Sequence, residues 1–498
     1  MKKFFLYFTL ISTVLSGCDK DNKEFEEDKE VTLSYIAVTE QPTKTEYYVG
    51  EGFILQGMKV TAYYSDKTTR IVTIIADMLS YDFSTVGEKT VTITYEGETT
   101  TVRGITVIYP FVGSGTSSMP FEISTPEQLA LLSNLTNNAN MEQFSSAHYK
   151  LTADIDLSAY GSKWNDGKGW IPIYRFKGHF EGNNHTINGL FIKNNNLYAS
   201  GLFSTVLEGT IQNVGVEGDI SSKSGIGGMA GNVSDGNIIN CYFIGSLSGE
   251  YEIGGVVGYV SGASNIISCY AKGTIRGSNA IGGVVGSQSQ ASSYGSPGIN
   301  IISHCYSTCT VSGENYVGGI VGETIGGGDE YQCSVSNCYA TGTVSGNRSV
   351  GGIAGRISGD NNSANVSHCY ATGAVSGKEY VGGIAGDVSP EWRGSVTYCA
   401  ALNPSITRIS GSEKSFGRVT GSDENNLQYN IAWYNMIIVD RSYWGNFDNK
   451  YGRDFYYYEI LHDGSFAGIF TPMDGWTIEN GKLPGFGATI NLPDHLTQ

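Results

Sequence analysis

The chain has 498 residues, a formal net charge of −17 at pH 7 and only 31 Lys and Arg residues. This balance excludes a nucleic acid as the partner, because a phosphate backbone is bound by clustered basic side chains. Glycine occurs 67 times and tyrosine 32 times, which is typical of an all-β, turn-rich protein that is exported from the cell.

The first residues form an export signal. Met1-Lys2-Lys3 precede an apolar run over residues 4–14, which is too short to span a membrane. The ending Leu15-Ser16-Gly17-Cys18 resembles a bacterial lipobox, which implies that Cys18 becomes the mature N-terminus and carries the acyl chains. We predict a lipoprotein signal peptide over residues 1–17; an ordinary secretory signal is the alternative.

An acidic tether follows at residues 18–30, which are highly charged and show no periodicity. It resembles the acidic export tag with which some Gram-negative bacteria send lipoproteins to the outer face of the outer membrane. The two resemblances imply an outer-membrane lipoprotein that is exposed at the cell surface and held there by its lipid anchor.

Residues 31–109 show the alternation of β-strands. Period-two runs over residues 58–64 and 90–95 are separated by turn signals, and about seven short strands in this length suit an immunoglobulin-like sandwich. The phrases at residues 41–47, 57–62 and 81–87 resemble the bacterial Ig-like domains of surface proteins, which implies a spacer. Asp66-Lys67 stands where that family usually has Asp-Gly, which leaves the turn type open.

A Gly- and Ser-rich linker, residues 110–118, leads to one predicted helix. Thr125 is expected at its N-cap, Pro126 at its first position and Gln128 at its third, followed by leucines at helical spacing. We interpret residues 119–186 as the N-terminal cap and lead-in of a solenoid, because a helix there shields the strand edges of the first coil.

The middle of the chain repeats one module. Each of five cysteines precedes the first glycine of a Gly-Gly pair by 13 residues, as Cys241 precedes Gly254, whereas the distance from one cysteine to the next varies from 28 to 36. A fixed module with length changes in one place predicts stacked coils with loops on one edge. We predict a parallel β-solenoid of roughly eight coils over residues 187–417; a propeller needs longer repeats.

Alternation within the module predicts the direction of each side chain. Cysteine and the small residues of the same parity point inward, whereas the tyrosine after each cysteine points to solvent in a stacked column. The glycines mark places where φ is positive or where two backbones pass closely. Residues 418–498 lose the repeat, become aromatic and are interpreted as the C-terminal cap.

From about residue 120 onward the chain resembles bacterial surface proteins with GLUG motifs, which implies location and shape rather than chemistry. The lead-in at residues 154–157 and 180–190 also matches this family. The matching motif units are Gly201-Leu202-Phe203, Gly228-Met229-Ala230-Gly231, Gly255-Val256-Val257-Gly258, Gly283-Val284-Val285-Gly286, Gly319-Ile320-Val321-Gly322, Gly352-Ile353-Ala354-Gly355 and Gly383-Ile384-Ala385-Gly386.

Eight cysteines follow Cys18, and six of them share the inward register. Stacked strands hold their Cβ atoms about 4.8 Å apart, whereas a disulfide prefers ~3.8 Å. We therefore expect a core column of free thiols. Cys309 and Cys333 fall outside that register, and a disulfide from either to a neighbouring loop is left open.

Motifs for catalysis, metals and cofactors give little. Residues 225–230 match a dinucleotide fingerprint by spelling, but the unit recurs in each coil without a following helix. His179, Glu181 and His185 look like an acid-base or metal group, yet they belong to the repeat lead-in. The carboxylates of Asp154 and Asp156 suit turns better than calcium. We expect no cofactor, no metal and no catalytic residue.

Binding candidates are the tyrosine column and the variable loops. Aromatic rings with polar tips can stack on sugars or on a partner protein, and loops of adjacent coils converge. We expect a lipid-anchored adhesin or extracellular binding protein whose ligand is a glycan or a surface protein, rather than an enzyme. A polysaccharide lyase or hydrolase and a passive stalk are the alternatives. The candidate binding residues are Tyr242, Tyr270, Tyr306, Tyr339, Tyr370, Tyr294, Tyr331 and Trp392.

Overall fold

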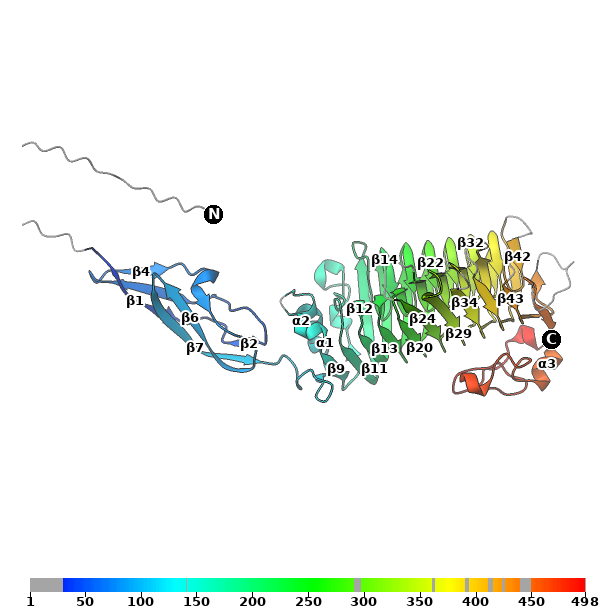
Figure 1. The fold of residues 1–498 in the computed structure, drawn as a ribbon, viewed down its shortest axis with the longest axis horizontal. Coiled ribbons are helices and arrows are strands. Elements are labelled where there is room, and N and C mark those ends of the chain that lie inside the picture. Colours follow the sequence, from blue (N-terminus) through cyan, green and yellow to red (C-terminus); the bar gives the residue numbers. More distant parts are fainter. Residues whose placement is uncertain are drawn as a thin grey trace, which may run out of the picture. The chain divides into compact units, whose positions relative to one another are not determined.

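The protein is described by a computed structural model that covers residues 30–139, 141–290, 297–360, 363–389, 394–410, 415–422, 426–438 and 449–497. It forms two compact units, of which the first ends at Ile108 and the second begins at Tyr109 (Figure 1). None of the helices in these ranges is long and apolar enough to cross a bilayer. Cys18 and the signal segment lie outside the described residues.

The first unit is the expected Ig-like sandwich of short strands. One sheet has the order β1-β3-β4 and the other β2-β7-β6-β5, and Val60, Ile93 and Val102 are fully buried between them. A short 3-10 helix spans Ala76–Met78. The strands are β1 (Leu33–Glu40), β2 (Glu46–Tyr48), β3 (Lys59–Tyr64), β4 (Thr69–Val72), β5 (Leu79–Ser80), β6 (Gly87–Tyr95) and β7 (Glu98–Ile108).

The hairpin between β3 and β4 answers the open question of turn type. Lys67 has φ 72°, so it takes the left-handed conformation that glycine would take in an Asp-Gly hairpin. Its amide donates to the carbonyl of Tyr64 at 2.9 Å, and Asp66 Oδ1 accepts from the amide of Thr68 at 2.8 Å. The carboxylate of Asp66 therefore holds the turn while Lys67 carries the backbone strain.

We predict that Lys67→Gly stabilises this hairpin. Glycine avoids the clash between Cβ and backbone in the left-handed region. Glycine also loses more chain entropy on folding, so the net gain in folding free energy is about 0.5–1 kcal/mol. Hydrogen exchange of the β3 and β4 amides in the full chain should slow about two- to fivefold. The matched variant Asp66→Ala removes the carboxylate acceptor and should speed exchange; equal rates in all three proteins would contradict this account.

The second unit begins with the predicted capped helix. In α1 (Pro126–Thr136), the amide of Gln128 donates to Thr125 Oγ1 at 3.3 Å, and Gln128 Oε1 accepts from the amide of Thr125 at 3.2 Å. Leu129 and Leu132 are fully buried in the core that continues into the solenoid. The neighbouring elements are β8 (Phe121–Ile123), α2 (Glu142–Ser145), β9 (His148–Leu151), β10 (Ile155–Asp156) and the 3-10 turns Ser158–Tyr160 and Asn165–Gly167.

Each coil of the solenoid contributes strands to three parallel sheets (Figure 1). We call them the first, second and third sheet. In the described residues the second sheet has seven strands: β12 (Phe203–Leu207), β15 (Ala230–Ser234), β19 (Val257–Ser261), β23 (Val285–Gln290), β28 (Val321–Gly326), β33 (Ala354–Gly359) and β38 (Ala385–Val388). The third also has seven: β14 (Ser224–Gly227), β18 (Tyr251–Gly254), β22 (Asn279–Gly282), β27 (Asn315–Gly318), β32 (Arg348–Gly351), β37 (Glu379–Gly382) and β42 (Phe416–Gly417).

The first sheet is continuous from β8 to β46; β11 and β13 are single long strands, and the later coils contribute two or three short strands each. Besides β8 to β10 it consists of β11 (His179–Asn194), β13 (Thr210–Ser222), β16 (Asn237–Ile239), β17 (Tyr242–Ser248), β20 (Asn265–Ile267), β21 (Tyr270–Arg276), β24 (Gly298–Ser303), β25 (Tyr306–Ser307), β26 (Thr310–Ser312), β29 (Tyr331–Ser336), β30 (Tyr339–Ala340), β31 (Val344–Ser345), β34 (Ala364–Ser367), β35 (Tyr370–Ala371), β36 (Val375–Gly377), β39 (Ser395–Thr397), β40 (Ala400–Ala401), β41 (Ser405–Arg408), β43 (Leu427–Gln428), β44 (Ile431–Trp433), β45 (Ile437–Ile438) and β46 (Arg453–Phe455).

The Gly-Gly pairs are explained by close approach of backbones. A Cβ at Gly319 would lie 2.1 Å from the carbonyl oxygen of Gly352 in the next coil, and one at Gly255 would lie 2.3 Å from the Ala271 side chain. Neither glycine has positive φ. One column of left-handed corners falls instead on the residue before each of the six inward cysteines: Asn240, Ser268, His304, Asn337, His368 and Tyr398, with φ from 51° to 55°.

Strand pairing extends further than the repeat does. After the last motif unit, β43 to β46 continue the first sheet through registered pairs such as Ala400↔Ile431 and Ile431↔Arg453. The chain then forms α3 (Tyr457–His462) and the 3-10 turns Pro472–Asp474 and Asp494–Leu496. Residues 463–497, which we call the return segment, turn back along the outside of the first sheet instead of extending the stack.

Candidate functional site

Five tyrosines stack on the outer face of the first sheet, one from each coil, and form what we call the tyrosine ladder. Parallel register places Tyr242 opposite Tyr270, and Tyr306 opposite Tyr339. Successive ring centroids lie 5.0, 4.7, 4.9 and 5.1 Å apart, with interplanar angles of 12° or less. This spacing follows from the strand separation of about 4.8 Å, so the backbone register imposes the stack.

The ladder begins at Tyr242 because the preceding coil has glycine in the same column. Gly215 pairs with Tyr242, and a Cβ on Gly215 would lie 2.0 Å from the Tyr242 ring. The Tyr242 ring therefore lies flat over bare backbone. Its hydroxyl reaches past Gly215 to the coil before it, where it lies 2.8 Å from Thr186 Oγ1. This contact holds the ring in place.

The expectation that this column faces solvent is wrong for its last two members. Tyr339 is 6% exposed and Tyr370 is fully buried. The return segment covers them: the rings of Trp476 and Phe486 lie 6.3 and 5.5 Å from that of Tyr339. The Tyr370 hydroxyl donates to the Pro484 carbonyl at 2.6 Å. Tyr242, Tyr270 and Tyr306 remain half-buried and accessible.

The corner residues before the cysteines also form columns. Asn240 donates to Asn213 Oδ1 at 2.8 Å, and His304 Nε2 lies 2.9 Å from the carbonyl oxygen of Asp474 in the return segment. Further along, a second aromatic stack consists of His368, Tyr398 and Tyr429, with centroids 5.0 and 4.8 Å apart. These aromatic side chains stack because the repeat places them in one column.

Burial and stacking change the acidity of the ladder. Desolvation, with a contribution from the neighbouring Tyr270, raises the pKa of Tyr306 to about 12. Burial also raises the pKa of Tyr270, Tyr339 and Tyr370. These four tyrosines therefore keep their hydroxyl protons at every physiological pH.

We predict a loss of stability in alkaline solution. An unfolded tyrosine ionises near pH 10, whereas folded Tyr306 holds its proton to about pH 12, so stabilisation that is complete below pH 10 is lost as pH rises between these values. Tyrosinate absorbance and the melting temperature, measured from pH 9 to 12, check this. Tyr306→Phe should remove one late-titrating tyrosine and flatten the fall; an unchanged titration would contradict the assignment.

The loop candidates do not join the ladder. Tyr331 opens β29, half-buried, and its amide donates to the Gly328 carbonyl at 3.0 Å. The left-handed corner at Asn337 separates it from Tyr339. Tyr294 and Trp392 lie outside the described residues.

All eight cysteines of the described residues are free and buried. The inward column behaves as predicted: Cys269 Sγ lies 3.4 Å from the Ile238 carbonyl oxygen of the preceding coil. A disulfide at Cys309 or Cys333 is not present. Burial raises the pKa of Cys309 to about 11 and that of Cys333 to about 12, so both thiols are unreactive in the folded state.

We predict eight protected thiols. Iodoacetamide should modify none of the eight cysteines after Cys18 in the folded protein at pH 8, because each is buried. After unfolding without a reductant, it should modify all eight. Intact mass spectrometry reads both states, and two unmodified cysteines in the unfolded sample would reveal a disulfide.

The polar side chains of the lead-in, Glu181, His185 and Asp154, form hydrogen bonds within the turns. Glu181 accepts from Gln212 at 2.7 Å and from Asn213 at 3.0 Å, and these bonds outweigh burial and lower its pKa. His185 Nδ1 lies 3.0 Å from Asp154 Oδ1. Among the described residues no three His, Cys, Asp or Glu side chains are placed to share a metal ion.

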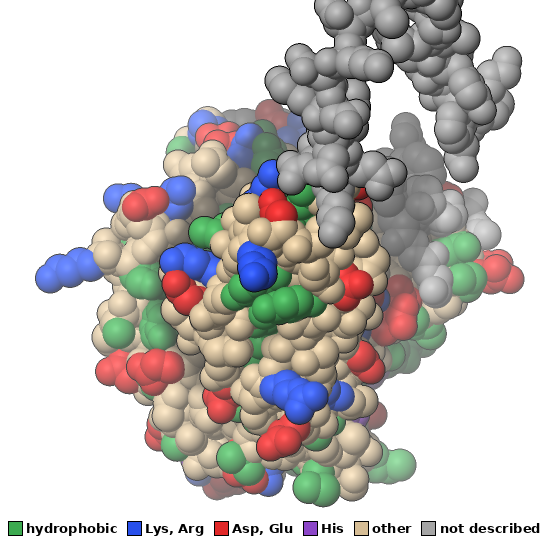
Figure 2. All heavy atoms as spheres, turned by 90° about the vertical axis from the view of Figure 1, so that its left-hand side faces the viewer, with side chains coloured by type: hydrophobic (Ala, Val, Ile, Leu, Met, Phe, Trp, Pro, Cys, Tyr) green, Lys and Arg blue, Asp and Glu red, His purple; other side chains and the backbone are tan. Residues whose placement is uncertain are grey.

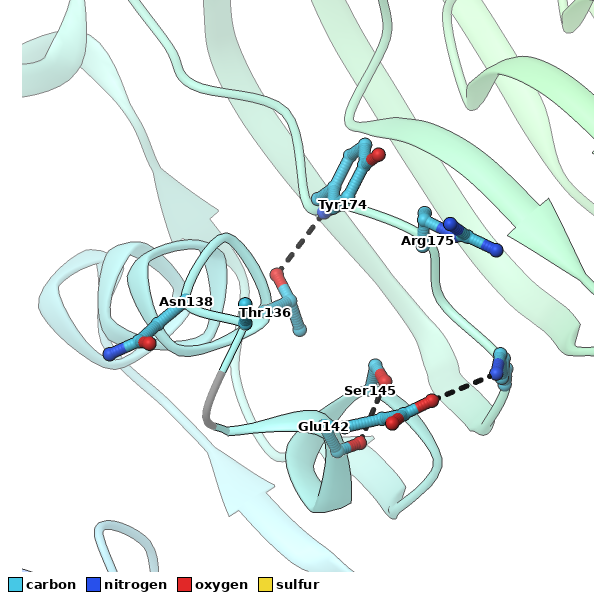
Figure 3. Close-up of a pocket in the computed structure, with 8 residues that line it drawn as sticks. Thr136, Asn138, Glu142, Ser145, Tyr174 and Arg175 are labelled. Atoms are coloured by element: carbon cyan, nitrogen blue, oxygen red, sulfur yellow. Dashed lines mark hydrogen bonds and ion pairs between the residues drawn. The ribbon is translucent and has the colours of Figure 1, made fainter. Parts of the chain in front are cut away.

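One pocket of about 250 Å³ lies beside α1 and α2 (Figure 3). Its polar groups are paired within the protein: Lys177 Nζ lies 3.0 Å from Glu142 Oε1, and the Tyr174 amide donates to Thr136 Oγ1 at 3.1 Å. In Figure 3 Arg175 points away from these groups, so the side chains do not converge on a ligand position.

On the face drawn in Figure 2, acidic and basic side chains are interspersed.

A charged cluster on the second and third sheets was not predicted. Arg356 Nη1 lies 3.2 Å from Glu323 Oε1 and 3.4 Å from the Tyr316 hydroxyl. Burial raises the pKa of Glu323 despite this arginine, and burial together with Glu323 raises the pKa of Glu252. The sequence contained a sign of this cluster, because the positions of Tyr316, Glu323 and Arg356 hold different residues in different repeats.

Two known families match parts of the chain. Residues 40–107 match the bacterial Ig-like domain (group 3), and residues 249–276, 313–345 and 346–376 match the GLUG motif. These matches confirm both family resemblances for the segments concerned. They cover the sandwich and part of the solenoid.

Curated relatives match the repeats over short lengths. Halomucin of Haloquadratum walsbyi is 37% identical over 128 residues, 23% of this chain and 1% of that protein. The exo-beta-1,6-galactobiohydrolase of Bifidobacterium longum is 41% identical over 66 residues, 12% of this chain and 4% of that protein. The chain thus corresponds to a small part of each.

Two solved structures align with much of the chain. A Bacteroides ovatus protein has a TM-score of 0.40 at 22% identity, over 75% of this chain and 94% of that one. An IgA1 protease has a TM-score of 0.39 at 15% identity, over 78% of this chain and 27% of that one. Similarity at this level carries no functional argument.

Proposed function

We propose that the protein is a lipid-anchored binding protein of the bacterial cell surface, whose solenoid holds a glycan on the open part of the tyrosine ladder. The observation that carries this proposal is the row of three half-exposed, parallel rings of Tyr242, Tyr270 and Tyr306. Aromatic faces with polar tips stack on flat apolar faces while their hydroxyls form hydrogen bonds.

Polar columns beside the ladder support this proposal. Ser246, Thr274 and Thr310 occupy one column of the same face. Each pairs with the next, as Ser246↔Thr274 and Thr274↔Thr310. Rings and hydroxyls thus recur once per coil at about 4.8 Å. A ligand that is itself a repeating polymer meets the same chemistry at each step, which favours a glycan.

The location rests on the first residues of the chain. An export signal that ends in a lipobox-like Leu-Ser-Gly-Cys and an acidic tether agree with surface display through acyl chains on Cys18. The Ig-like unit then serves as a spacer between the anchor and the solenoid. A protein partner on the ladder and a passive stalk are the other outcomes that the experiment below distinguishes.

The enzyme alternative needs paired carboxylates beside the bound sugar. Beside the three open rings the neighbouring columns hold other groups: Ile244 pairs with Lys272, and Ser248 with Arg276. Two carboxylates, Glu217 and Asp219, stand in these columns one coil before Tyr242, where they pair with Ile244 and Ser246. Product analysis in the experiment below therefore decides between retention of a glycan and its cleavage.

We predict that the purified mature chain retains glycans on an array of glycans and extracellular-matrix proteins, without releasing products. Tyr270→Ala together with Tyr306→Ala should weaken retention about five- to 150-fold, since each lost ring contact contributes about 0.5–1.5 kcal/mol. Tyr398→Ala, in the second aromatic stack, is the matched control and should bind as the unaltered protein does. Product release would favour the enzyme, and equal loss in the control would remove the ladder from the site.

A further inference from the structure

The repeats contain an internal alignment that separates structural positions from variable ones. Cysteine, the tyrosine after it and the motif glycines recur in each of five modules, whereas four positions vary, each with four or five residue types in the five modules. We call these the variable columns. They are Glu250, Ser278, Glu314, Asn347 and Lys378; Tyr251, Asn279, Asn315, Arg348 and Glu379; Glu252, Ala280, Tyr316, Ser349 and Tyr380; and Tyr259, Ser287, Glu323, Arg356 and Asp387.

The fold gathers these four columns at one surface, where Ala280, Ser287 and Ser349 are buried and the other seventeen residues are half-buried or exposed. Three of them run along the start of the third sheet, and the fourth follows the last glycine of the motif in the second sheet. A Cβ on Gly355 would lie 2.4 Å from the Tyr316 carbonyl carbon, and one on Gly322 would lie 2.5 Å from that of Ala280. The two sheets therefore meet backbone to backbone at these glycines, and the variable residues that flank them become neighbours.

Contacts join the columns across coils. The Arg356 guanidinium lies over the Tyr316 ring at 5.3 Å and pairs with Glu323 at 3.2 Å. Arg348 likewise lies over the Tyr380 ring at 5.3 Å and is 3.9 Å from Glu379. These pairs hold long side chains in fixed positions, which lowers the entropy lost when a partner binds.

The backbone indicates that side chains are needed here. The third variable column is left-handed in every module, with φ of 56° at Glu252, 59° at Ala280, 54° at Tyr316 and Ser349, and 53° at Tyr380. A non-glycine residue in this conformation costs roughly 1–2 kcal/mol. Glycine fits the equivalent position of an earlier coil, Gly225 with φ 57°, yet these five modules retain side chains there.

The chemistry of the columns selects the kind of partner. Successive rungs differ except at Asn279 and Asn315, so the columns match an aperiodic surface and not a repeating polymer. Twelve of the twenty residues are Tyr, Ser, Asn or Arg, the residue types with which antibodies contact folded proteins, and five are Glu, the commonest single type. Six acidic residues, Glu250, Glu252, Glu314, Glu323, Glu379 and Asp387, face three basic ones, Arg348, Arg356 and Lys378.

We propose that the variable columns form a second recognition surface, and that its partner is a folded extracellular protein with a basic patch. Charge complementarity steers such a partner to the surface and makes association sensitive to salt. The surface is separate from the tyrosine ladder, which lies on the first sheet. Glycan binding at the ladder and protein binding here are therefore independent properties.

The test exchanges residues between repeats. The variant Tyr316→Ala, Arg348→Asn, Glu379→Asn and Asp387→Ser places at each position a residue that another module already holds in the same column, so the fold tolerates the change. Both proteins are tested on an array of purified extracellular proteins from acidic to basic isoelectric points, with glycans printed beside them. Circular dichroism melting confirms that the variant is folded.

The expected result is retention of basic proteins by the unaltered chain and at least a tenfold loss in the repeat-exchange variant. Raising the salt from about 0.05 to 0.5 M should weaken that binding, since the Debye length falls well below 10 Å. The ladder variant Tyr270→Ala with Tyr306→Ala is the matched control: it should keep protein binding and lose glycans.

Three results would overturn this proposal. The first is protein binding by the repeat-exchange variant that is as tight as that of the unaltered chain. The second is loss of protein binding in the ladder variant alone, and the third is retention of no protein on the array. Glycan retention without protein binding would leave the proposed function standing and remove the second surface. Protein binding without glycan retention would do the reverse.

Discussion

The structure depends on one constraint, the exact repetition of register between stacked parallel strands. Each residue lies about 4.8 Å from its counterpart in the next coil, so every position must tolerate a copy of itself as its neighbour. Cysteine, valine and isoleucine satisfy this condition inside, as in the pairs Ile281↔Val317 and Val317↔Val350. Glycine satisfies it where backbones touch, because a Cβ at Gly352 would lie 2.1 Å from the carbonyl oxygen of its counterpart Gly383 in the next coil.

The same constraint produces surfaces of two kinds. Where the module is invariant, like side chains stack and form a periodic face, of which the tyrosine ladder is the clearest example. Where the module varies, as at Glu323, Arg356 and Asp387, adjacent rungs interact through charge and cation–π contacts. A periodic face suits a periodic ligand, and a varied face suits a partner with its own distinct shape and charge. A rigid scaffold with both faces can bind two classes of ligand.

The return segment determines how much of the periodic face is available. Trp476 is 2% exposed and donates its indole N–H to Asn337 Oδ1 at 3.1 Å, while Phe470 is fully buried against Tyr370. These residues use the stacking surface of the ladder as part of the hydrophobic core. The open rings of Tyr242, Tyr270 and Tyr306 show which contacts the face can offer a ligand, because the chain itself makes such contacts two rungs further on.

Local patterns determined what the sequence by itself could predict: the strands of the Ig-like unit, the capping box of α1, the coil module and the inward cysteine column. Period-two alternation, cap chemistry and a constant spacing of 13 residues act within one element or between neighbouring coils. Only the tertiary structure decided that Tyr370 is buried, since the Pro484 carbonyl that accepts its hydroxyl is 114 residues away. It also decided that Tyr316 and Arg356 meet. No local period encodes a contact between distant segments, because that contact depends on how the whole chain packs.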